Sequence, residues 1–394
     1  MEPIFAATIV LAFIAAGELV SIWSKARVPG LLVAMLGAFA FAQLGLIPTD
    51  VIDQSLLTDV YAILVVPLLF HMGSLIPLPT MIQQWRSVLI AISGMLVAVI
   101  ALAIVVIPLF SFEHFVAGAG PLAGGIVATG LTTAGLTEAG VASAIVILPS
   151  LVLMMQSLPS MPLTNFLLRR FAFSLRDSGE LDELAAQSKT RQANATTDTQ
   201  RKKLVRLPPM LENNELFVLF LILVGGTIAT LLAIPTHIPS SILGLILGII
   251  STAIGLTPER SMEKSSSFGI GMAGVVAIVM APLLTASMAD VIAALLPMVA
   301  ILIIGCIGIL GGGFIATKLL KWRPALGMSV ALTAMYGFPA DYLLTNEVAR
   351  SVGRDEAERE KLLDAMLPPM LVGGFTSVSA GSVAIASILV GFLG

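Results

Sequence analysis

Charged residues are scarce in this chain of 394 residues. Asp, Glu, Lys and Arg make up only 11% of it, whereas 57% of the residues are hydrophobic. Soluble domains carry about 25% charged residues, so the composition excludes an ordinary soluble protein. Cysteine is nearly absent, and the single Cys306 lies in an apolar segment, which excludes a disulfide framework. The three histidines are far apart in the sequence and offer no zinc-binding pattern.

Motifs of nucleotide-driven and enzymatic chemistry are also missing. The sequence contains no Gly-x-x-x-x-Gly-Lys-[Ser/Thr] loop, which disfavours an ATP-driven pump. It contains no His-Glu-x-x-His or Gly-x-Gly-Asp motif, which disfavours an intramembrane enzyme. We therefore expect no enzymatic activity and no nucleic-acid partner for a chain whose formal net charge is −3.

Long apolar stretches fill most of the chain. A membrane-spanning helix needs about 20 apolar residues to cross a hydrocarbon core of about 30 Å. Such stretches lie at about 4–23, 28–47, 60–77, 87–110, 141–168, 215–234, 238–256, 267–289, 291–317 and 363–393. Two further stretches, 121–140 and 324–346, are dense in Gly, Thr or Pro and carry a carboxylate, so we expect re-entrant segments there. The sequence thus predicts an all-α polytopic protein surrounded by membrane lipid.

A polar segment divides the chain into two halves. Residues 174–214 are predicted to form a cytoplasmic linker between an N-terminal membrane repeat, 1–173, and a C-terminal one, 215–394. When this linker is placed inside, all 21 basic residues fall on the inner side, as the positive-inside rule requires. Both termini then lie outside, and the two halves have opposite orientations.

Short sequence blocks recur in the same order in both halves. Residues 28–48 align without a gap with residues 238–258, which matches Pro29, Gly45, Leu46 and Pro48 to Pro239, Gly255, Leu256 and Pro258. Other matches join Pro67 to Pro282, Pro121 to Pro324 and, in the same register, Glu138 to Asp341. We therefore expect two inverted repeats, each of five transmembrane helices plus one re-entrant segment. This symmetry is typical of secondary transporters that work by alternating access.

The candidate site lies where the two interrupted segments converge. Half-helix N-termini supply partial positive charge there, and unwound carbonyls can coordinate a cation. Carboxylates at membrane depth are costly and usually functional, although a solvated position at a helix end would also account for them. The candidate ligands of a coupling cation are Thr137, Glu138, Asp341 and Asn346. The candidate substrate-binding residues are Thr132, Thr133, Gly135, Tyr336, Gly337, Pro339 and His71, the last being either a functional or a packed histidine.

Four segments carry a resemblance to a known family: KARVPGLLVA (25–34), PLLFHMGSL (67–75), GFPADYLLTNEVARSVG (337–353) and LPPMLVGGF (367–375). With them the chain resembles the bacterial glutamate:sodium symporter family. The resemblance implies Na⁺-coupled uptake of an acidic amino acid, a homodimer and a place in the bacterial cytoplasmic (inner) membrane.

One segment departs from the family pattern. Where the family has a Gly-Gly-His-Gly-like turn, this chain reads TTAGLTEAG at 132–140. Its substrate is therefore expected to be glutamate or another small carboxylate. The alternatives are an H⁺-coupled transporter, an exporter of another organic anion, and an uncoupled channel.

Overall fold

The computed structural model of the chain describes residues 1–24, 28, 30–75, 82–181, 204–205, 207–337 and 340–393. In these ranges every regular element is a helix and no strand occurs. Seven helical stretches are long and apolar enough to cross a membrane: Pro3–Val20, Trp85–Leu109, Ser143–Ser178, Glu215–Thr236, Phe268–Thr285, Met288–Leu319 and Glu356–Val390. The structure thus agrees with the expected all-helical, multi-pass membrane protein.

The first half of the chain contains ten described helices. In chain order these are α1 (Pro3–Trp23), α2 (Gly30–Gln43), α3 (Val51–Gln54), α4 (Leu57–Met72), α6 (Trp85–Leu109), α7 (Phe112–Leu122), α8 (Gly125–Glu138), α9 (Ser143–Val146), α10 (Leu148–Met155) and α11 (Ser157–Ser178). Helix α11 continues past the expected boundary at residue 173. Most of the expected linker, residues 182–203 and 206, lies outside the described residues.

The second half follows a similar order. Its elements are α13 (Pro209–Glu212), α14 (Glu215–Thr236), α15 (Ser240–Ile254), α16 (Ser261–Lys264), α17 (Phe268–Thr285), α18 (Met288–Leu319), α19 (Pro324–Leu332), the 3₁₀ turn η1 (Thr333–Met335), α20 (Ala340–Val352), α21 (Glu356–Phe375), a π-helical segment (Thr376–Gly381) and α22 (Ser382–Val390).

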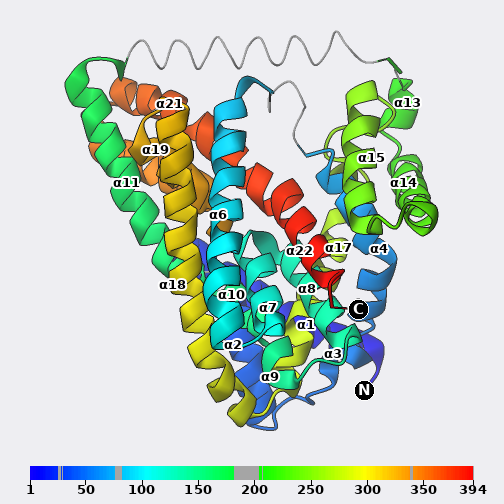
Figure 1. Cartoon of the computed structure of the whole chain (residues 1–394). Helices are drawn as coiled ribbons and strands as arrows, with labels where there is room; N and C mark the ends of the chain where they lie inside the picture. Colours follow the sequence, from blue (N-terminus) through cyan, green and yellow to red (C-terminus); the bar gives the residue numbers. More distant parts are fainter. Residues whose placement is uncertain are drawn as a thin grey trace.

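The two halves are joined through two long antiparallel helices, α6 and α18, which lie side by side (Figure 1). The Ser93 hydroxyl of α6 donates to the Gly312 carbonyl of α18 at 3.2 Å. Further along, a Cβ atom placed on Gly308 would lie 2.5 Å from the Cα of Ala98. Glycine and alanine at these points let the two backbones approach closely, which is how helices associate inside a membrane.

The interrupted helices lie in the interior, each covered by a helix from the other half. Helix α22 packs against α7 and α8, and α11 packs against α19 and α20 (Figure 1). The main hydrophobic core likewise draws on both halves, with Leu102, Val116, Leu136, Ile309 and Met335 among its buried members. Each interrupted segment is therefore packed against a helix of the other half.

The close α6–α18 contact predicts opposite effects for two adjacent glycines. A Cβ on Gly312 would collide with the Ser93 carbonyl, whereas a Cβ on Gly311 meets nothing within 4 Å. We expect Gly312→Ala to destabilise the protein by about 1–3 kcal/mol through overpacking. Gly311→Ala should be neutral or stabilising by up to about 1 kcal/mol. Thermal unfolding of both variants in detergent measures the difference, and equal shifts would contradict the close contact.

Candidate functional site

Two helices are interrupted inside the protein. Helix α7 gives way to α8 at Gly124 and Gly125, whose φ angles are +136° and +83°. L side chains rarely adopt such angles, so glycine makes this turn possible. Helix α19 tightens into η1 and then turns at Gly337, where φ is +60°, before α20 begins. Pro339, one of the candidate residues, lies outside the described residues.

A third irregular segment meets both interruptions. The π-helical segment Thr376–Gly381 places Val378 between them. A Cβ on Gly125 would lie 2.6 Å from Cγ1 of Val378, and a Cβ on Gly337 would lie 2.6 Å from its Cγ2. We name Gly124, Gly125, Gly337 and Val378 the break cluster. π-helical turns are rare and often mark functional sites, so this convergence identifies the candidate site.

The break cluster is partly open and electrostatically suited to small ions. Gly125, Val378 and the neighbouring Tyr336 are each partly exposed. Helix α8 begins at the cluster, and no side chain caps its first turn. The N–H groups of an uncapped first turn carry partial positive charge and attract anions. The cluster can therefore hold a small anion without a basic side chain.

Asp341 lies just beyond the second interruption, as the second residue of α20. Its side chain is fully buried, with 0% exposure. The Tyr342 N–H donates to Oδ1 at 2.7 Å, but Oδ2 has no hydrogen-bond partner among the described residues. This oxygen faces α21, because a Cβ on Gly374 would lie 2.5 Å from it. A buried carboxylate with a free oxygen is costly unless a cation or a proton neutralises it.

Two hydroxyl groups accompany this carboxylate. Tyr336 lies beside Thr164 and close to Asp341. Neither hydroxyl has a well-formed hydrogen bond within the described part of the chain. We name Asp341, Tyr336 and Thr164 the Asp341 cluster. Its free oxygens are of the kind that bind hard cations such as Na⁺.

The polar face of α11 was missed by the sequence interpretation. Three side-chain oxygens are buried without a hydrogen-bond partner in the described part of the chain: those of Gln156, just before the helix, and of Ser157 and Thr164 on it. Ser157, Ser160 and Thr164 are spaced three and four residues apart, which places them on one helix face. This helix packs against α19 and α20. The helical spacing of polar residues inside an apolar span was the signal that could have found them.

The three predicted substrate-binding residues of α8 are all buried, but they differ in whether they have a free hydroxyl group. Thr132, Thr133 and Gly135 are buried, as a site inside the protein requires. The Thr132 hydroxyl, however, donates to the Ala128 carbonyl at 2.9 Å, whereas that of Thr133 has no partner among the described residues. Gly135 contacts Val390 of α22. Of the three, Thr133 alone offers a free ligand atom.

Glu138 and Asp341, which the sequence alignment matched to each other, occupy different positions in their helices. Glu138 is the last residue of the 14-residue helix α8, about 20 Å from the break cluster by helix rise, and it is exposed. Asp341, in contrast, is buried at the start of α20. The register fails because Pro121 stands at the end of α7 whereas Pro324 begins α19.

Two other candidate cation ligands also have local partners. Thr137 is exposed beside Glu138, and its hydroxyl donates to the Thr133 carbonyl at 2.8 Å. The side-chain amide of Asn346 is half-buried and donates to the Tyr342 carbonyl at 2.9 Å. Asp341 is therefore the one predicted cation ligand that the structure leaves buried with a free oxygen in the described ranges.

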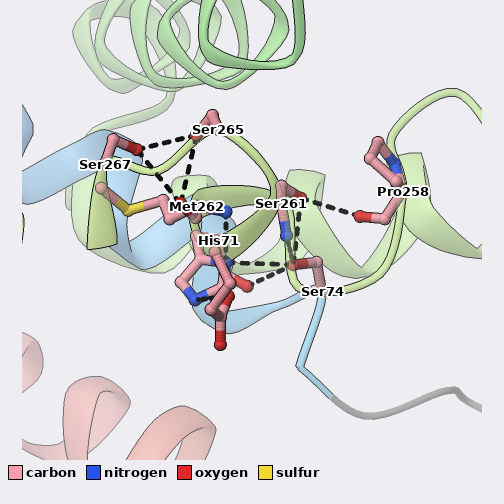
Figure 2. Close-up of polar contacts among 8 residues, drawn as sticks. His71, Ser74, Pro258, Ser261, Met262, Ser265 and Ser267 are labelled. Atoms are coloured by element: carbon pink, nitrogen blue, oxygen red, sulfur yellow. Dashed lines mark hydrogen bonds and ion pairs between the residues drawn. The ribbon is translucent and has the colours of Figure 1, made fainter. Parts of the chain in front are cut away.

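His71 connects the two halves of the chain through contacts with α16 rather than with the break cluster. Figure 2 shows it buried against the start of α16, where its Nδ1 accepts the Met262 N–H at 3.2 Å. Because Nδ1 accepts this bond, the ring proton sits on Nε2, which lies 3.2 Å from Oε2 of Glu263. Its ring also packs edge-on against Phe268 at 5.5 Å between centroids.

Ser74 completes this connection. Its hydroxyl accepts the Ser261 N–H at 3.3 Å (Figure 2). Its carbonyl accepts the Arg260 N–H, also at 3.3 Å. Three successive N–H groups at the start of α16 are thus bonded to the end of α4. We name His71, Ser74 and these three N–H groups the α4–α16 cap. The ring of His71 is used in packing and capping, which agrees with the packed histidine of the two alternatives that the sequence left open.

Comparison of the chain with protein-family models and with curated proteins finds no match. Within the described residues, no three His, Cys, Asp or Glu side chains gather to hold a metal ion. A cation at Asp341 would therefore depend on hydroxyl and carbonyl oxygens. The function has to be inferred from this geometry.

The break cluster predicts that substitutions at Gly337 and Val378 are coupled. Gly337→Ala adds a Cβ that collides with Val378 and also strains the positive φ angle. Gly45→Ala is the matched control, because φ is +70° there but nothing lies within 4 Å. We expect Gly45→Ala to cost about 1 kcal/mol and Gly337→Ala about 1–3 kcal/mol more. Adding Val378→Ala should recover most of that extra cost in thermal unfolding, and a simply additive loss would contradict the contact.

The α4–α16 cap predicts a stability effect at His71. Replacing it with Ala leaves the buried Met262 N–H without an acceptor, which should cost about 1–3 kcal/mol. His114→Ala is the control, because among the described residues its ring hydrogen-bonds within the same helix start, to Ser111, and packs against the nearby Phe110. Thermal unfolding should therefore separate the two variants. A His71→Ala protein of unchanged stability would refute the capping role.

Proposed function

We propose that the chain is a cation-coupled secondary transporter of a small organic anion, namely glutamate or a related small carboxylate, with Na⁺ as the coupling ion. One observation carries the proposal. Asp341 is fully buried, has a free carboxylate oxygen and lies where two interrupted helices and a π-helical segment converge. Ionisable residues at membrane depth commonly belong to ion pathways.

Backbone geometry supports the inverted repeat that such transporters use. Helices α2 and α15 end in the same motif, with Gly45 at φ +70° and Gly255, 210 residues later, at φ +89°. In both, the glycine N–H bonds three residues back and the next N–H five residues back. The same separation relates Leu56 and Ser266, which have φ angles of +57° and +53°.

Helix packing supports the same symmetry. In the proposed repeats α11 corresponds to α22, α7 to α19 and α8 to α20. The contact of α11 with α19 and α20 then corresponds to the contact of α22 with α7 and α8, and both contacts occur. The third-span match carries less weight. Helices α4 and α17 begin at corresponding points, yet Pro67 is the eleventh residue of the first and Pro282 the fifteenth of the second. We propose two repeats, each with five spans and one re-entrant segment.

The electrostatics suggest how the cation and the anion are coupled. An ionised Asp341 repels a carboxylate that approaches the nearby break cluster, and this repulsion is strong where water is sparse. A cation bound by the Asp341 cluster removes the repulsion. The substrate carboxylate can then bind at the uncapped start of α8. The cation would therefore bind first, and the empty carrier would not bind the anion alone.

Several features of the proposal rest on the family resemblance. These are Na⁺ itself, the bacterial cytoplasmic membrane and the homodimer, whereas the placement of both termini outside also follows from the distribution of the basic residues. In Figure 1 two described parts of the expected linker, the last turn of α11 and the short helix α13, lie at the end of the bundle away from the N-terminus. This arrangement supports an N-terminus on the side opposite the linker.

A proton is the specific alternative to Na⁺. The same free oxygen of Asp341 could take up H⁺, and the chain would then be an H⁺-coupled transporter. An uncoupled channel would need no such carboxylate.

The proposed role of Asp341 predicts a selective loss of cation binding. In a thermal-shift assay with NaCl against choline chloride, Na⁺ should stabilise the wild type by mass action. Asp341→Asn should weaken Na⁺ binding about tenfold or more, whereas the matched Glu138→Gln should leave it unchanged. Uptake of labelled L-glutamate into proteoliposomes under a Na⁺ gradient should fall in parallel.

Two results would change the conclusion. Unchanged Na⁺ stabilisation in Asp341→Asn would refute the cation site. Stabilisation that depends on pH but not on Na⁺, and is lost in the same variant, would establish the H⁺-coupled alternative.

A further inference from the structure

Two basic side chains lie at the same level at one end of the α6–α18 pair. Ser93 and Gly312 are in contact, and the helices are antiparallel. Moving seven residues from each point toward the same end reaches Arg86 on α6 and Leu319 on α18. Arg86, the second residue of α6, is therefore level with Lys318 in the last turn of α18. Both side chains are exposed.

Each of these charges is held over an aromatic ring. The Arg86 guanidinium lies 5.6 Å from the ring centre of Trp85, and the Lys318 ammonium lies 5.5 Å from that of Phe314. Such contacts fix the position of an exposed cation without neutralising it. The sequence places no Asp or Glu in 85–109 or in 291–323. The two cations are thus held in place without a carboxylate near them on their own helices.

The surface beside these cations is apolar and exposed. Trp85 is 47% exposed, Leu89 46%, Phe314 42%, Ile315 51% and Leu319 77%. In a membrane-spanning pair, this surface faces lipid chains, and tryptophan is typical of the boundary between chains and head groups. The opposite end differs, because α18 begins there with the acidic Asp290.

We propose that this end of α6 and α18 is a binding site for an anionic phospholipid. The lipid phosphate lies between Arg86 and Lys318, and its acyl chains run along the apolar surface below. Basic residues between membrane helices are suited to anionic head groups, each contributing to binding near the membrane surface. Because these helices join the two halves of the chain, the bound lipid stabilises that junction. This inference does not depend on the transport proposal.

The test compares lipids and variants by native mass spectrometry of the full chain in detergent. Phosphatidylglycerol should be retained, and phosphatidylcholine of the same chain length should not. Arg86→Gln with Lys318→Gln should weaken phosphatidylglycerol binding about 30-fold, from the loss of two surface charges. The matched control is Arg350→Gln with Arg354→Gln, which removes two exposed charges elsewhere. It should bind as the wild type does.

Each other outcome has a definite meaning. Equal losses in the two double variants would show that net charge alone attracts the lipid, and would overturn the site. Equal retention of phosphatidylcholine would show an apolar surface without head-group selection, with the same consequence. Glycerol 3-phosphate tests a free phosphate, and binding as tight as that of the lipid would refute a lipid site. If the double variant unfolds, Arg86→Gln alone should still weaken binding about fivefold.

Discussion

The absence of water inside a membrane is the constraint on which this structure depends. Backbone N–H and C=O groups that leave a helix there must be enclosed by protein. The chain turns at Gly124–Gly125 and at Gly337. It meets the constraint because helices of each half cover the interrupted segment of the other half. The π-helical segment and α22 cover the first turn, while α11 covers α19 and α20 around the second. Each interruption is therefore covered in part by a helix of the other half.

This enclosure also gives Asp341 its importance. Without this enclosure, the Asp341 carboxylate would be exposed to solvent at a helix end, as the Glu138 carboxylate is at the end of α8. Buried beside Gly374, its free oxygen makes the unliganded, ionised state costly. A site that is costly when empty binds its neutralising ion strongly. The proposed coupling therefore follows from burial, and it needs no basic residue at membrane depth to hold the anion.

Sequence reasoning located the interruptions and Asp341 because glycine, threonine and a carboxylate rarely gather inside an apolar stretch unless the backbone turns or binds a ligand there. It could not find the correct register between the halves. A gapless alignment matched Pro121 to Pro324, but only the structure shows that α7 ends near the first and α19 begins at the second. Thr164 was missed because its significance depends on Tyr336, which lies far away in the sequence. The partners of His71 in α16 were hidden for the same reason.

The two proposed repeats share backbone features but differ in the bonds at their ends, and this difference bears on the proposed alternating access. Helices α16 and α3 are related by the 210-residue separation, and each packs against the third span of the other half. The start of α16 is capped by His71 and Ser74, whereas no side chain caps the start of α3. If the two ends open in turn, opening at α16 must separate polar partners that are buried together. The start of α3 has no such side-chain cap to break. In the proposed alternation, the α4–α16 cap therefore adds to the cost of opening its end of the protein.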